Sequence, residues 1–298
     1  MARHRSDFLV EDPAGERHRC LAGRRDLRPL VGDRVVFLPA GDGDSGRIEQ
    51  LKPRDNCLER IDSRGRPEPL AANLTQLLVI LAPEPAPDPL LVDRFLCAAR
   101  LLGLSASLVC NKRDLAGGET GLAALLEEYR QIGYRVHHCS ARRCDGLDEL
   151  RSCLAGQVTS LVGQSGVGKS SLVNRLVPDA GQAVGEISGK SGEGRHTTTT
   201  AVAYRLPDGG LVIDFPGVRG YSPPLPEPAR VQSGYAEIAA LAAGCRFANC
   251  LHQEEPACAV KAAVEGGRIS TRRYQSYLHL LRLAQRLDTP QTRSRRRD

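Results

Sequence analysis

A glycine-rich stretch, Gly163-Gln-Ser-Gly-Val-Gly-Lys-Ser170, has the spacing G-x-x-x-x-G-K-S/T, with an apolar run before it and a helix-like run after it. Its glycines permit the positive φ angles that let successive N–H groups surround an anion. Lys169 would reach the β- and γ-phosphates and take part in catalysis, and Ser170 would ligate Mg²⁺. A plain turn before a helix is the alternative, but the strand-loop-helix context favours a nucleotide-phosphate site with the contacts Gly163, Gln164, Ser165, Gly166, Val167, Gly168, Lys169, Ser170 and Ser171.

Two further motifs would select the base. Asn111-Lys112-Arg-Asp114 fits N-K-x-D at the end of an expected strand. The Asp114 carboxylate can accept from both N1–H and N2–H of guanine, a pair of donors that adenine lacks, and each such bond is worth about 1.5–3 kcal/mol. Ser140 and Ala141, at the next strand end, would place a backbone N–H toward guanine O6, although this pair also fits an ordinary strand end. The nucleotide is therefore predicted to be GTP or GDP.

A motif at a third strand end would contact magnesium and the γ-phosphate. Asp214-Phe-Pro-Gly217 fits D-x-x-G, so Asp214 would hold Mg²⁺ through water and the Gly217 N–H would contact the γ-phosphate. Each tetrapeptide occurs by chance in many proteins, but the three motifs together at strand ends indicate GTP binding.

The order of the motifs is unusual. In GTPases generally the base-reading motifs follow the phosphate loop, whereas here they precede it. We therefore predict a circularly permuted domain, because joining the old ends and cutting elsewhere preserves the neighbours of every strand. The segment after Asp214 then runs directly into the C-terminal part, and we hypothesise that the nucleotide state moves that part.

A compact group of metal-ligand residues lies near the C-terminus. Its spacing is C-x4-C-x-H-x5-C, and its members are Cys245, Cys250, His252 and Cys258. Three thiolates and one imidazole complete a tetrahedral Zn²⁺ shell and leave no open position, so we predict one structural zinc. The alternative is three free thiols and a surface histidine that cluster by chance.

The composition is that of a globular protein, with 298 residues, 41% hydrophobic and 26% charged. We find no signal peptide and no run of 18 apolar residues, so we expect a cytoplasmic protein without membrane contact. Ten Cys then indicate reduced thiols or a metal site. Residues 268–298 contain nine Arg and two Asp within a chain of net charge +6, which fits either a polyanion partner or a solvated tail.

The expected elements divide the chain into three domains. Short alternating runs in 1–70 predict a small β-barrel, with an oligonucleotide-binding fold as one candidate. Alternating strands and helices in 71–222 predict a doubly wound α/β domain, the permuted GTPase domain. The part 223–298 is expected to be a zinc-binding helical domain with a basic tail, its helices at 229–243, 257–265 and 270–287.

Taken together, the chain resembles the circularly permuted, small-ribosomal-subunit-dependent GTPases that act in late assembly of that subunit. The resemblance rests on the motifs above, on Val31-Gly-Asp33-Arg-Val, on Gly194-Arg-His196-Thr-Thr-Thr and on Asp214-Phe-Pro-Gly217-Val-Arg. It implies an N-terminal oligonucleotide-binding barrel (OB-fold), a permuted GTPase core and a helical zinc domain. It also implies weak GTP hydrolysis that the small subunit stimulates.

The resemblance also bears on catalysis. Val218 stands where Ras-like GTPases have a water-positioning Gln, and its side chain cannot orient water. The family's proposed substitute corresponds to His196, with a loop histidine of no catalytic role as the alternative. Thr198, or as second choice Thr197, would join Ser170 and Asp214 as a magnesium ligand.

The favoured function is a GTPase that binds the small (30S) ribosomal subunit and its rRNA in late assembly, hydrolyses GTP to GDP and phosphate, and then leaves. We expect it to act as a monomer. The alternative is a GTP-switched rRNA-binding module with negligible hydrolysis, which Val218 leaves open. A P-loop kinase of a small metabolite is disfavoured, because such an enzyme has no need of Asn111–Asp114.

Overall fold

The computed structural model describes residues 7–41, 45–61, 66–115, 119–177, 202–214, 224 and 226–287. Its centre is a six-stranded sheet in the order β11-β12-β10-β7-β8-β9. The strands from β12 to β9 run parallel, and β11 pairs antiparallel with β12. The strand bounds are β7 Gln76–Leu81, β8 Ser105–Cys110, β9 Arg135–His138, β10 Val158–Val162, β11 Val202–Arg205 and β12 Leu211–Asp214.

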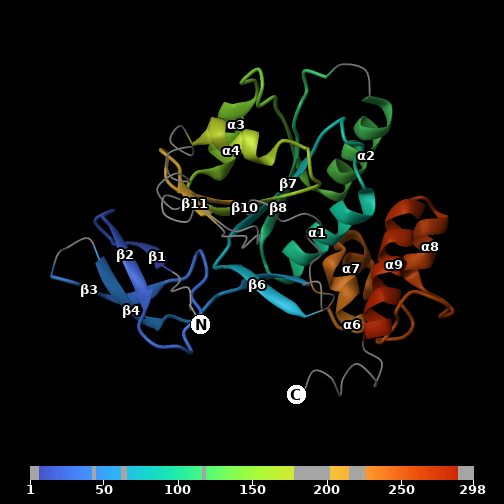
Figure 1. The fold of residues 1–298 in the computed structure, drawn as a ribbon. Helices are drawn as coiled ribbons and strands as arrows, with labels where there is room; N and C mark the ends of the chain where they lie inside the picture. The colour runs from blue at the N-terminus through green and yellow to red at the C-terminus, as the bar shows by residue number, and fades with distance from the viewer. Residues whose placement is uncertain are drawn as a thin grey trace.

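Helices cover both faces of this sheet (Figure 1). Every residue of β7 is buried, as expected of a central parallel strand. Leu77, Val79 and Leu81 pack with α1 and α2, while Leu78 and Ile80 pack with α3 and α4. This period of two confirms the doubly wound α/β fold, with helix bounds α1 Pro89–Leu101, α2 Glu119–Ile132, α3 Leu147–Leu154 and α4 Lys169–Leu176.

The N-terminal part is rich in β-structure. A four-stranded sheet has the order β1-β2-β4-β3, and β5 and β6 form a two-stranded sheet. A bridge joins Val31, in the segment between β2 and β3, to Ala71 of β6. Gly32, at φ 89°, fits against the carbonyl oxygen of Ala72, which a Cβ atom would approach to 2.1 Å. The bounds are β1 Asp7–Glu11, β2 Arg17–Ala22, β3 Val35–Pro39, β4 Ser45–Leu51, β5 Cys57–Ile61 and β6 Pro67–Ala72.

The C-terminal part is helical and packs on α1 (Figure 1). The predicted helix 229–243 is wrong as one piece, because Tyr235 has extended backbone angles. Gly234 lies against Cys97 of α1, where a Cβ atom would come within 2.2 Å of the sulfur, so the chain turns at this close contact. The bounds are α6 Pro228–Val231, a 3₁₀ turn at Gln232–Gly234, α7 Ala236–Ala242, α8 Ala259–Glu265 and α9 Thr271–Leu287.

The predicted fold class is confirmed by the β-rich N-terminal part, the α/β core with the permuted motif order and the C-terminal helices with clustered Cys and His. The domain boundaries at residues 70 and 222 stay predictions. Within the described residues, no helix is long and apolar enough to cross a membrane.

Candidate nucleotide site and metal centre

The glycine-rich loop joins the end of β10 to the start of α4, as predicted. Gly163, Gly166 and Gly168 have positive φ angles of 146°, 86° and 93°. A Cβ atom at Gly163 would lie 2.3 Å from the carbonyl oxygen of Ile80, and one at Gly168 would lie 2.4 Å from Asn111 Nδ2. Glycine is therefore required at Gly163 and Gly168 both for the backbone angles and for close packing, and at Gly166 for the backbone angle. A loop of this kind lets successive N–H groups surround a phosphate.

Lys169 begins α4 and folds back over this loop. Its Nζ donates hydrogen bonds to the carbonyl oxygens of Gly163 and Gln164, both at 2.8 Å. Burial lowers the pKa of Lys169, and the carboxylate of Asp214, buried at the end of β12, acts in the opposite direction. The ammonium group thus lies among the loop carbonyls, beside the N–H groups that would surround a phosphate.

The side chain of Asn111 connects three of the predicted motifs. It is 1% exposed. Its Nδ2 donates to the carbonyl oxygen of Val167 in the phosphate loop at 2.9 Å, and its Oδ1 accepts from the Ala141 N–H at 3.0 Å. Asn111 therefore holds the phosphate loop and the two base-reading loops in fixed positions.

Asp114 is presented as an acceptor. Its Oδ1 accepts a hydrogen bond of 2.5 Å from the Ser140 hydroxyl, which in turn accepts from the Arg143 N–H at 3.1 Å. The bond from Ser140 is the main reason that the pKa of Asp114 is lowered. The Ser140 N–H donates to the carbonyl oxygen of Asp145 at 2.9 Å. Ser140 therefore acts on the site through its hydroxyl, and the predicted N–H contact with guanine O6 stays a prediction.

The segment that precedes α1 takes part in the site, although its sequence indicated only a stiff connector. Lys112, at φ 60°, donates from Nζ to the carbonyl oxygen of Glu84 at 2.8 Å. The N–H of Asp88, the N-cap of α1, donates to Gln164 Oε1 at 3.1 Å. The segment lies at the carboxyl end of β7, between the strands that bear the other motifs, and this position is the signal that could have revealed its role in the site.

The other predicted site residues fall into two groups. Ser165, Ser170 and Ser171 are exposed at the loop and the first turn of α4. The remaining predicted catalytic and switch residues lie outside the described residues: His196, Thr197, Thr198, Gly217 and Val218.

The cysteine and histidine cluster assembles as predicted. The candidate ligand atoms of Cys245, Cys250, His252 and Cys258 all lie within 4.8 Å of one another. The sulfur atoms of Cys245 and Cys258 are 3.8 Å apart. Zn–S bonds of about 2.3 Å place two thiolates of a tetrahedral site about 3.8 Å apart. The donor set and its spacing therefore fit zinc.

The histidine of the cluster is oriented for metal binding. His252 Nδ1 lies 3.3 Å from the Cys258 sulfur, and its Nε2 lies 2.8 Å from Gln232 Oε1. Because Gln232 accepts the Nε2 proton, the Nδ1 lone pair is left for a metal. Tyr274 and Tyr277 of α9 donate to the carbonyl oxygens of His252 and Leu251, at 2.5 and 2.8 Å, so the cluster and the long helix support one another.

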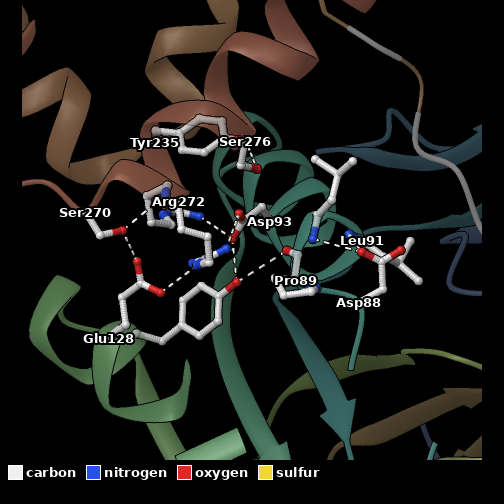
Figure 2. A network of polar contacts seen from close by, with 12 residues as sticks. Asp88, Pro89, Leu91, Asp93, Glu128, Tyr235, Ser270, Arg272 and Ser276 are labelled. Atoms are coloured by element: carbon white, nitrogen blue, oxygen red, sulfur yellow. Dashed lines mark hydrogen bonds and ion pairs between the residues drawn. The ribbon is translucent and has the colours of Figure 1, made fainter. Parts of the chain in front are cut away.

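A buried polar network fixes the C-terminal helices to the nucleotide domain (Figure 2). Asp93 of α1 is 0% exposed and Arg273 of α9 is 1% exposed. Asp93 accepts from Arg273 Nη1 at 2.5 Å and from Arg272 Nη1 at 2.9 Å. Glu128 accepts from Arg272 Nε and Glu237 accepts from Arg273 Nε, each at 2.7 Å. Each arginine is thus shared between Asp93 and a second acidic residue.

The replacement Asp93→Asn is expected to lower the free energy of unfolding by about 3–5 kcal/mol, because it leaves the buried Arg273 without its closest carboxylate. Denaturant titration of both proteins measures the difference. Asp148→Asn is the matched control, since the Asp148 side chain is 98% exposed in its pair with Arg151 and should change stability by less than about 1 kcal/mol. Equal losses in the two variants would contradict this interpretation.

The features above define a class of protein. A phosphate loop, an N-K-x-D loop and a strand-end Asp meet at one edge of a parallel sheet, and the base-reading loop comes first in the chain. That is a circularly permuted guanine-nucleotide-binding domain of the P-loop class.

Comparison with known proteins gives the family. A family model described as RsgA GTPase matches residues 51–223, which is more than half of the chain. The protein named Small ribosomal subunit biogenesis GTPase RsgA from Chromohalobacter salexigens is 48% identical over 277 residues, 91% of this chain and 81% of that protein. The protein of the same name from Moorella thermoacetica is 43% identical over 286 residues, 94% of this chain and 95% of that protein. The chain belongs to the RsgA GTPase family.

Two solved structures agree with this conclusion. YjeQ from Thermotoga maritima superposes with a TM-score of 0.75 at 30% identity, covering 94% of this chain and 95% of that one. YloQ, described as a circularly permuted GTPase, gives a TM-score of 0.73 at 27% identity and covers 95% of this chain and 93% of that one. Both comparisons extend across the β-rich, α/β and helical parts of the chain.

Proposed function

We propose that the protein is a GTPase that binds the small ribosomal subunit, hydrolyses GTP to GDP and phosphate with stimulation by that subunit, and acts in its late assembly. The observation that carries this proposal is the position of Asn111, which fixes the phosphate loop beside the base-reading loops. Phosphate binding and base selection are thereby coupled in one site. The names of the relatives from Chromohalobacter salexigens and Moorella thermoacetica support the ribosomal role.

Within this proposal the residues of the site have separate roles. Asp114 accepts from guanine, Lys169 exchanges its loop carbonyl partners for phosphate oxygens, and the loop N–H groups surround the phosphates. Ser170, Asp214 and Thr198 would hold Mg²⁺, which neutralises charge on the phosphates. The cluster at Cys245–Cys258 would hold one structural zinc. A ribosomal partner would require a location in the cytoplasm, which we propose for this protein, and we propose that the monomer is the active form.

Hydrolysis requires a group that orients water, and Val218 provides none. We propose His196 for this task, placed when the small subunit binds. Replacing His196 by Ala is expected to reduce subunit-stimulated turnover at least about 100-fold, in line with loss of general base catalysis, and to leave GTP affinity unchanged.

Phosphate release, measured with and without purified small subunits, tests this prediction. His279→Ala is the matched control, because His279 is exposed on α9, and it should keep full activity. No stimulation of the unchanged protein by small subunits would instead favour a GTP-switched rRNA-binding module. Full stimulation of the His196 variant would remove His196 from the mechanism and leave the GTPase proposal intact.

A further inference from the structure

A partly buried polar cluster lies between α3 and strands β7, β9 and β10 of the central sheet. Gln76 is the first residue of β7 and Thr159 the second of β10, whereas the phosphate loop follows the other end of β10. Cys153 and Glu149 of α3 and His137 of β9 complete the cluster. We call these five residues the thiol cluster. Neither the nucleotide site nor the zinc site uses them.

Hydrogen bonds orient an amide donor toward the Cys153 sulfur. The Thr159 hydroxyl donates to Gln76 Oε1 at 2.9 Å. This bond fixes the Gln76 amide so that its Nε2 donates to the sulfur of Cys153 at 3.2 Å. The sulfur thus accepts a hydrogen bond, and such a bond is stronger when the sulfur is a thiolate.

His137 provides an acceptor for the thiol proton. Its side chain is 8% exposed, and its Nδ1 lies 2.9 Å from Glu149 Oε1. Its Nε2 is buried and has no hydrogen-bond partner among the described residues. Cys153 is the neighbour that raises the pKa of His137 most, with Glu149 adding to the effect. A cysteine, a histidine and an orienting carboxylate in this order are the parts of an activated nucleophile.

The direction of its pKa shift distinguishes Cys153 from four other cysteines of the chain. The nearby His137 side chain has the largest effect on the pKa of Cys153 and lowers it, Gln76 and Arg135 act in the same direction, and partial burial opposes them. Burial has the opposite net effect elsewhere and raises the pKa of Cys20, Cys57, Cys97 and Cys139, the last two to about 12. A lowered pKa together with partial exposure is the combination that makes a cysteine reactive.

We propose that Cys153 is a modification site that forms a mixed disulfide with small-molecule disulfides such as glutathione disulfide. The Cys153 thiolate attacks one sulfur of the reagent, a new S–S bond forms and the S–S bond of the reagent breaks. The second half leaves as a thiolate and takes up the proton held by His137. Cys153 is oxidised and the reagent is reduced, so the exchange needs no other oxidant.

The test is the rate of modification at each cysteine as a function of pH. The zinc-loaded full chain is incubated with glutathione disulfide between pH 5.5 and 9.5, quenched with acid and analysed by peptide mass spectrometry. Cys144, which is exposed and outside the cluster, is the internal control. The rate at each cysteine is divided by the plateau that the same cysteine reaches at high pH. At pH 6.5 this ratio should be about ten times larger for Cys153 than for Cys144.

Two variants make the result specific. His137→Asn should shift the pH midpoint of Cys153 upward and remove the tenfold difference. Glu149→Gln changes a side chain that is 66% exposed, so the fold is retained, and should reduce the difference about threefold. Identical pH profiles for Cys153 and Cys144, or a Cys153 profile unchanged by Glu149→Gln, would overturn the proposal.

Discussion

Removal of zinc from the Cys245–Cys258 cluster is expected to unfold the C-terminal helices and to leave GDP binding intact. Structural zinc contributes about 10–16 kcal/mol in small zinc domains, the largest single contribution expected in this molecule. Without the ion, the thiols lose the partner that holds them within 4.8 Å of one another. Cys258 is also the N-cap of α8, and its sulfur accepts from the Lys261 N–H at 3.5 Å, so the disturbance passes directly into a helix.

Hydrogen exchange measures this effect by segment. After chelation and confirmed loss of metal, amides of α8 and α9 should exchange faster, whereas those of β7 and β10 should not. Cys258→Ser should reproduce the result, and Cys144→Ser, at an exposed thiol outside the cluster, should not. Retained protection of α8 and α9 in metal-free protein would show that packing on α1 alone is sufficient for the fold.

The buried network around Asp93 bears on how the nucleotide state could reach the C-terminal helices. The sequence suggested that the segment after Asp214 moves the C-terminal part, and that segment lies outside the described residues. Within the described residues, Asp93 and Arg273 join the C-terminal helices to α1 through buried charges. The N-cap of α1, Asp88, contacts Gln164 of the phosphate loop. The helix α1 therefore connects the phosphate loop with the C-terminal helices that pack around the cysteine and histidine cluster.

Much of the fold could be predicted because its signals are local. The apolar run from Leu77 to Leu81 in β7 and the alternating strand and helix patterns of the core depend on residues close in sequence. Strands β1, β2 and β6 lie outside the predicted alternating runs, and RHRCLA of β2 and PEPLAA of β6 mix charged, proline and alanine residues. The break at Gly234 also has no local cause, since it depends on contact with Cys97 of α1.

The residues of the candidate site also divide into those that the sequence could predict and those that it could not. Motifs with fixed spacing, such as the phosphate loop and the cysteine cluster, could be found from the sequence because their chemistry constrains neighbouring residues. The roles of Glu84 and Asp93 could not, because each depends on partners far along the chain. Asp93 in particular reads as an ordinary polar residue of a helix, and only the tertiary structure places two arginines beside it.

Replacing Asp114 by Asn is expected to change the nucleotide that the protein selects. The carboxylate can accept both guanine donors, and its ionised form is stabilised by the hydrogen bond from Ser140. Loss of two charge-assisted bonds, at about 1.5–3 kcal/mol each, predicts a fall in GTP affinity of about 10²–10⁴-fold. Xanthine has an oxygen in place of the guanine amino group, which matches the amide donor of Asn, so affinity for xanthosine triphosphate should rise.

Calorimetric titration with GTP, xanthosine triphosphate and ATP distinguishes this base contact from a general loss of charge. Asp145→Asn is the matched control, because Asp145 lies beside the same loop in an exposed pair with Arg113, 3.8 Å away, and its replacement removes one carboxylate without touching the predicted base position. That variant should keep its preference for GTP, and both variants should melt within a few degrees of the unchanged protein. An Asp114→Asn protein that is folded and still prefers GTP to xanthosine triphosphate would show that the base is held elsewhere. The coupling that Asn111 provides between the phosphate loop and the base loops would then have to act through another acceptor.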